Sequence, residues 1–197
     1  MWSAISLPSS VPSVAPVSDN MEHGLHYAFY DHSDKKSDGP KMYAELLRSA
    51  QNSIRIWDPY FNKSGASDHL LFGYIKNPVE IYYLTNGTKV ENCRIAREKA
   101  QLLWDNVPVA VRDKSTLHFA FVTKDVNDDY MFHDRWLILD DSRYFLVGGS
   151  INYHAGTPTC STGIYEVMDD EDQQLISKKF NKFYQHAIDD SACIIKP

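Results

Sequence analysis

Short apolar runs alternate with longer stretches of helical periodicity along most of this chain, and this alternation limits the folds that it can adopt. Strand-like patterns lie at residues 25–30, 53–57, 79–84, 117–122, 136–139 and 144–147. Apolar residues at helical spacing lie at residues 41–52, 68–75, 91–104 and 175–188. Strands that alternate with helices predict an α/β fold, in which helices flank a mixed β-sheet.

Residues 1–22 differ in composition from the rest of the chain. They are rich in Ser, Pro and Val, and closely spaced prolines disfavour both a helix and a central strand. We expect this segment to be a leader, or a linker through which a partner protein or a fused domain is attached. Residues 23–197 then form one domain, which is long enough to bury a substantial core.

The composition excludes several classes of protein. The chain has 20 Lys and Arg against 26 Asp and Glu, a formal net charge of −6, so a polyanionic substrate would need a local basic site. No apolar run approaches the roughly 20 residues that span a bilayer, and we expect no stable membrane insertion. Three scattered cysteines predict neither a disulfide framework nor a cysteine-based zinc site, and they favour the cytoplasm.

A histidine and a basic residue precede the apolar run at residues 136–139. His133 and Arg135 are one residue apart, so in an extended strand both side chains project to the same side. Seven residues separate His133 from Asp140, so strand parity places Asp140 on the opposite side. We therefore expect Asp140 to have a structural role in the turn rather than a chemical one.

A glycine pair comes after the next strand pattern. Gly148 and Gly149 permit a close approach of the backbone to a ligand, and Ser150 and Asn152 offer polar groups at the same spacing of two. The combined pattern resembles the signature of the phospholipase D superfamily, which is His-x-Lys-x4-Asp followed by a Gly-Gly-Ser-x-Asn segment. Arg135 stands in place of the family's Lys. With the helix and strand before residue 61 and the terminal helix, the resemblance covers about residues 40–188.

The resemblance implies a phosphodiesterase that needs no metal and no cofactor. In the family, one His attacks phosphorus to form a phosphohistidine, and a second His protonates the leaving oxygen. Here His133 would be the nucleophile or the acid, and Arg135 would hold the phosphate with support from Ser150 and Asn152. Glu166 would orient His133, unless it is an ordinary strand acid.

Four further residues are candidates for contact with substrate. Asp58 and Tyr60 come after a predicted strand. In one interpretation they line the site from the end of the sheet; in the other, Asp58 and Pro59 simply end that strand. Gly149 offers its backbone, and His154 either reaches the site from its loop or is an exposed loop histidine.

Only one such motif is present, so the chain supplies half of a two-histidine site. Family members of this length form a symmetric dimer, and we expect a homodimer here. The resemblance favours a nuclease that acts on nucleic acid, DNA rather than RNA, in a bacterial defence or restriction context. The alternatives are a weakly active or inactive module that binds phosphates of nucleic acid or lipid, and a phospholipase.

Overall fold

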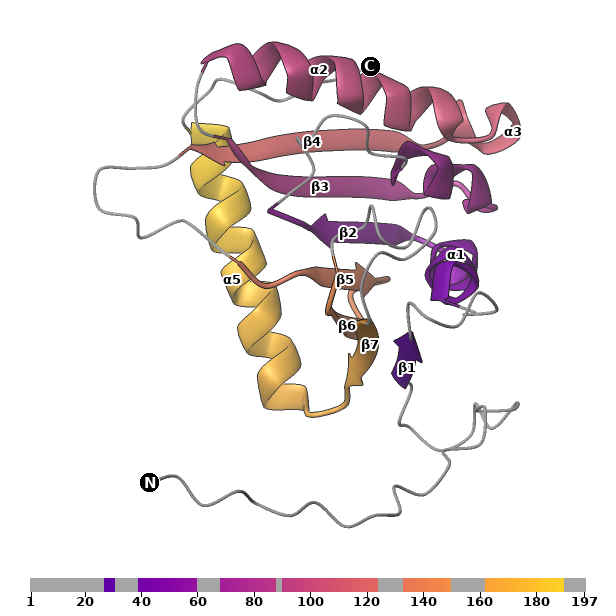
Figure 1. Cartoon of the computed structure of the whole chain (residues 1–197), viewed down its shortest axis with the longest axis vertical. Helices are drawn as coiled ribbons and strands as arrows, with labels where there is room; N and C mark the ends of the chain where they lie inside the picture. The colour runs from indigo at the N-terminus through magenta and orange to yellow at the C-terminus, as the bar shows by residue number, and fades with distance from the viewer. Residues whose placement is uncertain are drawn as a thin grey trace, which may run out of the picture.

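The computed structural model describes residues 27–30, 39–59, 68–87, 90–123, 133–149 and 162–189. Its centre is a seven-stranded sheet with the strand order β1-β7-β6-β5-β2-β3-β4 (Figure 1). The strands are β1 (Tyr27–Tyr30), β2 (Ser53–Trp57), β3 (Glu80–Gly87), β4 (Thr116–Thr123), β5 (Trp136–Leu139), β6 (Arg143–Val147) and β7 (Thr162–Val167). The helices are α1 (Gly39–Ser49), the 3₁₀ helix η1 (Asp68–Tyr74), α2 (Val90–Asn106), α3 (Val109–Arg112) and α5 (Asp170–Asp189).

The sheet is mixed, as the sequence predicted. Strands β2, β3 and β4 are parallel, whereas β2 pairs with β5 in the antiparallel sense and the pairs β5–β6, β6–β7 and β7–β1 are also antiparallel. As a result, the carboxyl ends of β2, β3, β4 and β6 lie at the same end of the sheet as the beginnings of β5 and β7. We call this the motif end of the sheet, and the other the turn end.

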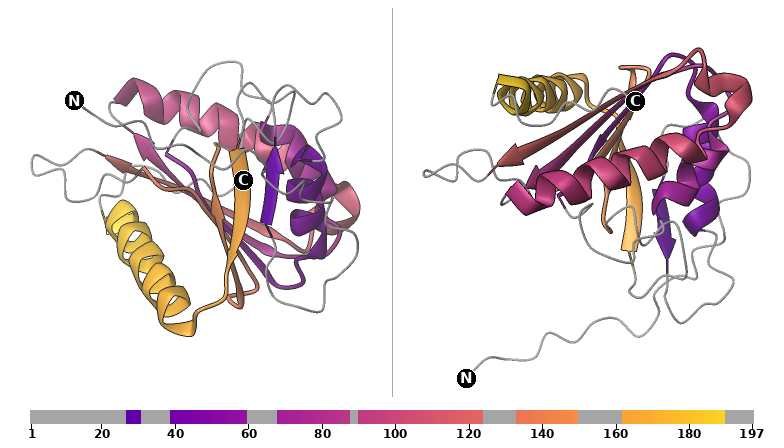
Figure 2. Two further views of the ribbon diagram at one scale, coloured as in Figure 1. Left: turned by 60° about the horizontal axis from the view of Figure 1, so that its bottom comes forward. Right: turned by 90° about the horizontal axis from the view of Figure 1, so that it is seen from above.

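Helices cover both faces of the sheet. Helices α1, η1 and α2 pack on one face and α5 crosses the opposite face, as the two views in Figure 2 show. In β2 the side chains of Ile54 and Ile56 belong to the core beneath α1 and α2, whereas Trp57 belongs to the core beneath α5. Such alternation is expected of a strand that is buried on both faces.

Arg55 attaches α5 to the sheet and to the turn between β5 and β6. Its Nε lies 2.8 Å from the Asp141 carboxylate, and its Nη1 donates to Asn181 Oδ1 over 2.8 Å. The guanidinium also lies 5.3 Å from the centre of the Tyr82 ring and 5.6 Å from that of Phe180. One half-buried cation therefore joins an ion pair, a hydrogen bond and two aromatic rings.

The strand patterns predicted the sheet well. The predicted bounds of β2 and β5 are confirmed; β4 is one residue longer than predicted at each end, and β6 begins one residue earlier. Strand β3 runs past its predicted end at residue 84 because β4 pairs with it as far as Gly87 and Thr123. The sequence patterns set no range for β7 or α3.

One predicted helix limit is wrong: α1 ends at Ser49 rather than at residue 52, because the next backbone N–H groups bond to Asp140. Helix α5 begins at Asp170, so the acidic residues before its apolar pattern at residue 175 form its first turn, as their charge predicts. Asp169 accepts a hydrogen bond from the Asp172 N–H over 3.0 Å, and acidic residues fill the first turn, both of which favour a helix start.

Candidate functional site

The motif residues gather at the motif end of the sheet. His133 and Arg135 directly precede β5, Gly148 and Gly149 directly follow β6, and Asp58 directly follows β2. Because β5 runs antiparallel to both β2 and β6, its beginning meets their ends. Open α/β sheets bind ligands at such an end, outside the carboxyl ends of parallel strands.

Four of the predicted site residues fall outside the part of the chain that the structure describes. They are Tyr60, Ser150, Asn152 and His154. Their roles remain predictions, and the geometry below rests on the other residues of the site.

Arg135 joins the two halves of the motif. Its Nη1 donates to the Gly148 carbonyl over 3.0 Å, and its own carbonyl accepts from the Val147 N–H over 2.9 Å. The Gly148 N–H donates in turn to the Gly163 carbonyl over 2.7 Å, at the beginning of β7. The half-buried guanidinium is thus held at the motif end by the backbone of β6, while His133 is exposed beside it.

Asp58 is a buried acid at the same end. Only 2% of it is exposed, and its N–H donates to the Leu84 carbonyl over 3.0 Å, which extends the pairing of β2 with β3 by one residue. Asp58 therefore both ends the strand and lies at the motif end, so the two interpretations of the sequence are compatible.

Glu166 lies away from the motif, toward the turn end of the sheet. It pairs in register with Phe145, which pairs with Leu137, four residues from His133. At about 3.3 Å per residue this separates the row of Glu166 from that of His133 by about 13 Å. Its Oε1 instead lies 3.1 Å from Arg143 Nε, and only 7% of its side chain is exposed. The pair with Arg143 favours the interpretation of Glu166 as a strand acid, and its role toward His133 remains a prediction.

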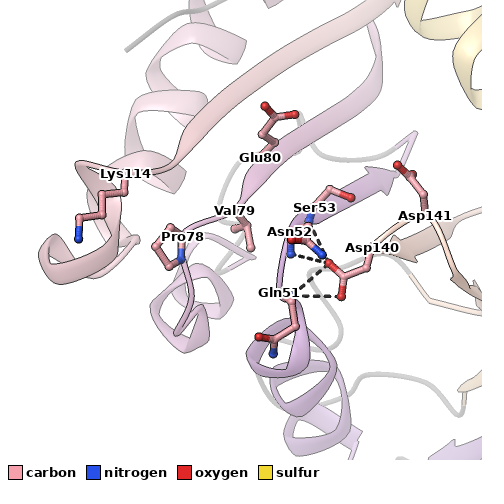
Figure 3. Close-up of a pocket in the computed structure, with 9 residues that line it drawn as sticks. All are labelled: Gln51, Asn52, Ser53, Pro78, Val79, Glu80, Lys114, Asp140 and Asp141. Atoms are coloured by element: carbon pink, nitrogen blue, oxygen red, sulfur yellow. Dashed lines mark hydrogen bonds between the residues drawn. The ribbon is translucent and has the colours of Figure 1, made fainter.

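Asp140 lies at the turn end, in the tight connection between β5 and β6. Asp140 and Asp141 have φ values of 56° and 53°, left-handed conformations that suit a two-stranded hairpin and that Asp tolerates. The Asp140 carboxylate accepts from the N–H groups of Gln51, Asn52 and Ser53 over 3.1, 2.6 and 3.0 Å (Figure 3). It thereby fixes the hairpin to the connection between α1 and β2.

An open hollow of about 400 Å³ lies beside this turn. Figure 3 shows the residues that line it, which are Gln51, Asn52, Ser53, Pro78, Val79, Glu80, Lys114, Asp140 and Asp141. It is at the opposite end of the sheet from His133 and Arg135, so it is separate from the motif. Within the described ranges, no three or more His, Cys, Asp or Glu side chains are grouped so that they could hold a metal ion.

Known structures share this fold. NucT from Helicobacter pylori is 15% identical over 87% of this chain and 99% of its own, with a TM-score of 0.52. Nuc from Salmonella typhimurium, a phospholipase D family member, is 10% identical over 88% of this chain and 97% of its own, also with a TM-score of 0.52. The chain therefore has the fold of the phospholipase D superfamily, as the sequence motif predicted.

Other comparisons are weaker or negative. The archaeal chromatin protein TrmBL2 is 17% identical over 97% of this chain, with a TM-score of 0.44, and the chain spans 57% of its length. No family model matches the sequence, and no curated protein matches it significantly. In the part of the chain that the structure describes, none of the helices has the length and apolar character needed to cross a membrane.

Proposed function

We propose that this protein is a phosphodiester hydrolase that cleaves nucleic acid, DNA rather than RNA, without a metal ion. The observation that carries the proposal is the Arg135–Gly148 hydrogen bond, which joins both halves of the motif beside an exposed His133. A histidine nucleophile next to a fixed guanidinium suits phosphoryl transfer, because the cation stabilises the charge on the phosphoryl oxygens.

The proposed reaction has two steps. In the first, a ring nitrogen of His133 forms a bond to phosphorus, the P–O bond to one nucleotide breaks, and a second histidine gives its proton to the leaving oxygen. In the second, that histidine takes a proton from water, whose oxygen bonds to phosphorus as the P–N bond breaks. The products are a phosphate monoester and a hydroxyl, and both histidines return to their first state.

The second histidine is proposed to be the His133 of another copy of this chain. A two-fold axis near the motif end would place the same residue from each subunit on either side of one phosphate. The chain supplies a single motif, so each half-site is incomplete without its partner.

Cleavage in the presence of EDTA tests the activity. We expect the purified protein to cut DNA under these conditions and His133→Ala to lose at least about a hundredfold in rate, since general acid–base catalysis is worth that much. His69→Ala, on η1, is the matched histidine control. Unchanged cleavage by His133→Ala, or no cleavage of DNA or RNA by a confirmed dimer, would refute the proposal.

Mixing the subunits tests the shared site. Wild-type and His133→Ala subunits are mixed and allowed to exchange. If each site needs both histidines, the remaining activity is proportional to the square of the fraction of wild-type subunits. A linear loss would show that each subunit works alone.

A binding module is the second candidate. It is favoured by Arg135, since a guanidinium binds phosphate bidentately but differs in geometry from the ammonium of the family's Lys. Phosphate binding without turnover at any tested substrate would select this alternative.

A further inference from the structure

Three polar residues lie side by side across neighbouring strands at the motif end. Trp57 of β2 pairs with Leu84 of β3 and with Trp136 of β5. One residue further toward the motif end, the same register sets Asp58 between Thr85 and Arg135. The Asp58 N–H bond to the Leu84 carbonyl continues the β2–β3 pairing to this row, and the Val147 N–H bond to the Arg135 carbonyl continues the β5–β6 pairing. Asp58 faces Arg135 by the register of β2 with β5, one residue beyond the Trp57–Trp136 pair.

The row is polar in a sheet whose interior is mostly apolar. Asp58 and Thr85 are 2% and 1% exposed. Burying a carboxylate is unfavourable unless it is paired with a cation or well hydrogen-bonded. Two buried polar groups next to the motif's basic residue therefore indicate a functional requirement rather than ordinary core packing.

Thr85 is the second buried polar residue of the row. Its Oγ1 is buried and has no hydrogen-bond partner in the described part of the chain. A valine of the same shape would fill the position without that loss, so stability alone does not explain the hydroxyl. Its place beside Asp58 gives the hydroxyl a carboxylate as its neighbour in the row.

We propose that Asp58 is a positioning residue that holds and orients the guanidinium of Arg135 for phosphate. Directly opposite residues of an antiparallel pair have Cα atoms about 4.5–5.5 Å apart, so the two side chains are close neighbours on one face. This inference rests on the proposed phosphate site, and it assigns Asp58 to the arginine rather than to the substrate.

The proposal also explains why Arg suits this position. A guanidinium has five N–H donors in a rigid fork, whereas an ammonium has three donors on one nitrogen. One donor of Arg135 is used by the Gly148 carbonyl. A planar fork of this kind can bond to an acid and to a phosphate at once, with its plane fixed by the acid.

A double-mutant cycle tests the link between the two residues, with inorganic phosphate as the probe. We expect Asp58→Asn to weaken phosphate binding about tenfold in the wild-type background, as measured by calorimetry. In a protein that already carries Arg135→Lys, the same change should weaken binding less than about twofold, because coupled residues do not act additively. Glu80→Gln, an exposed acid on β3, is the control and should leave binding unchanged. Equal losses in both backgrounds, or no loss, would overturn the proposal.

Kinetics and rescue separate positioning from a merely structural role. Asp58→Asn should raise KM for DNA more than it lowers kcat, and Asp58→Glu should restore part of the binding while circular dichroism shows each variant folded. If the effects of Asp58 and Arg135 on phosphate binding are coupled but no nucleic acid is cleaved, the positioning role stands and the proposed hydrolase is rejected. If nucleic acid is cleaved but the two residues are not coupled, the hydrolase stands and the positioning role is rejected. A wild-type protein that neither binds phosphate nor cleaves nucleic acid would reject both proposals.

Discussion

Thr85 gives the sharpest expectation at the scale of one residue. Because its buried hydroxyl makes no hydrogen bond within the described ranges, Thr85→Val should raise the free energy of unfolding by up to about 1 kcal/mol. Urea denaturation measures the effect, with Thr85→Ser as the control that keeps the hydroxyl. A variant that is less stable than wild type would contradict this account.

A substitution of Asp140 should lower the stability of the protein strongly and leave the binding of substrate unchanged. Asp140→Ala removes the acceptor of three backbone N–H groups and places Ala in a left-handed conformation. We expect a loss of about 2 kcal/mol in the free energy of unfolding, and a smaller loss for Asp140→Asn, which keeps one oxygen and tolerates the conformation. At a temperature where the variant remains folded, its KM for DNA should be unchanged.

Residue types alone predicted part of the site. The spacing of His133 and Arg135 from the glycine pair was visible in the sequence because these residues flank two strands that are consecutive in the chain. The strand neighbours of Glu166 and Thr85 could not be predicted in this way. They depend on the register between strands, and the central pairing of β2 with β5 joins segments far apart in the sequence.

At the scale of elements, Tyr184 of α5 makes the stability of the folded protein depend on pH in the alkaline range. Burial and the neighbouring Tyr82 raise the pKa of Tyr184 from 10.0 to about 12. Below pH 10 the phenol is neutral in the folded and the unfolded chain. Between pH 10 and about 12 it ionises only in the unfolded chain, so stability falls as the pH rises through this window.

Tyr184→Phe tests this assignment. We expect the variant to lose less stability than wild type between pH 10 and 12, as measured by the urea midpoint. The fall will not vanish, because burial also raises the pKa of Tyr82. Identical pH profiles for the two proteins would show that Tyr184 does not carry the effect.

The limits of the elements show where local patterns are insufficient. Hydrophobic periodicity placed the strands because the sheet is buried on both faces. It misplaced the end of α1, where a carboxylate from a distant turn binds the backbone, and it did not mark the start of α5, whose first turn is acidic and exposed. Periodicity reports buried faces and is silent about polar helix ends.

At the scale of the whole molecule, net charge governs how the proposed substrate is captured. With a net charge of −6 and Arg135 as the local cation, few phosphates are neutralised on binding. We expect KM for DNA to rise about fourfold to tenfold between about 50 and 200 mM salt, as one or two released counterions would give. A much steeper dependence would reveal a basic groove, and a flat one would argue against contacts to phosphate.

The pairing of β1 with β7 sets the order in which the sheet is completed. Tyr27 lies opposite Tyr165, so this edge joins segments from opposite ends of the described chain, whereas β5 and β6 are joined by a tight turn. Closing the longer loop costs more entropy and slows folding. During synthesis β1 leaves the ribosome long before β7 exists. We therefore expect the β1–β7 pairing to form later in folding than the β5–β6 hairpin.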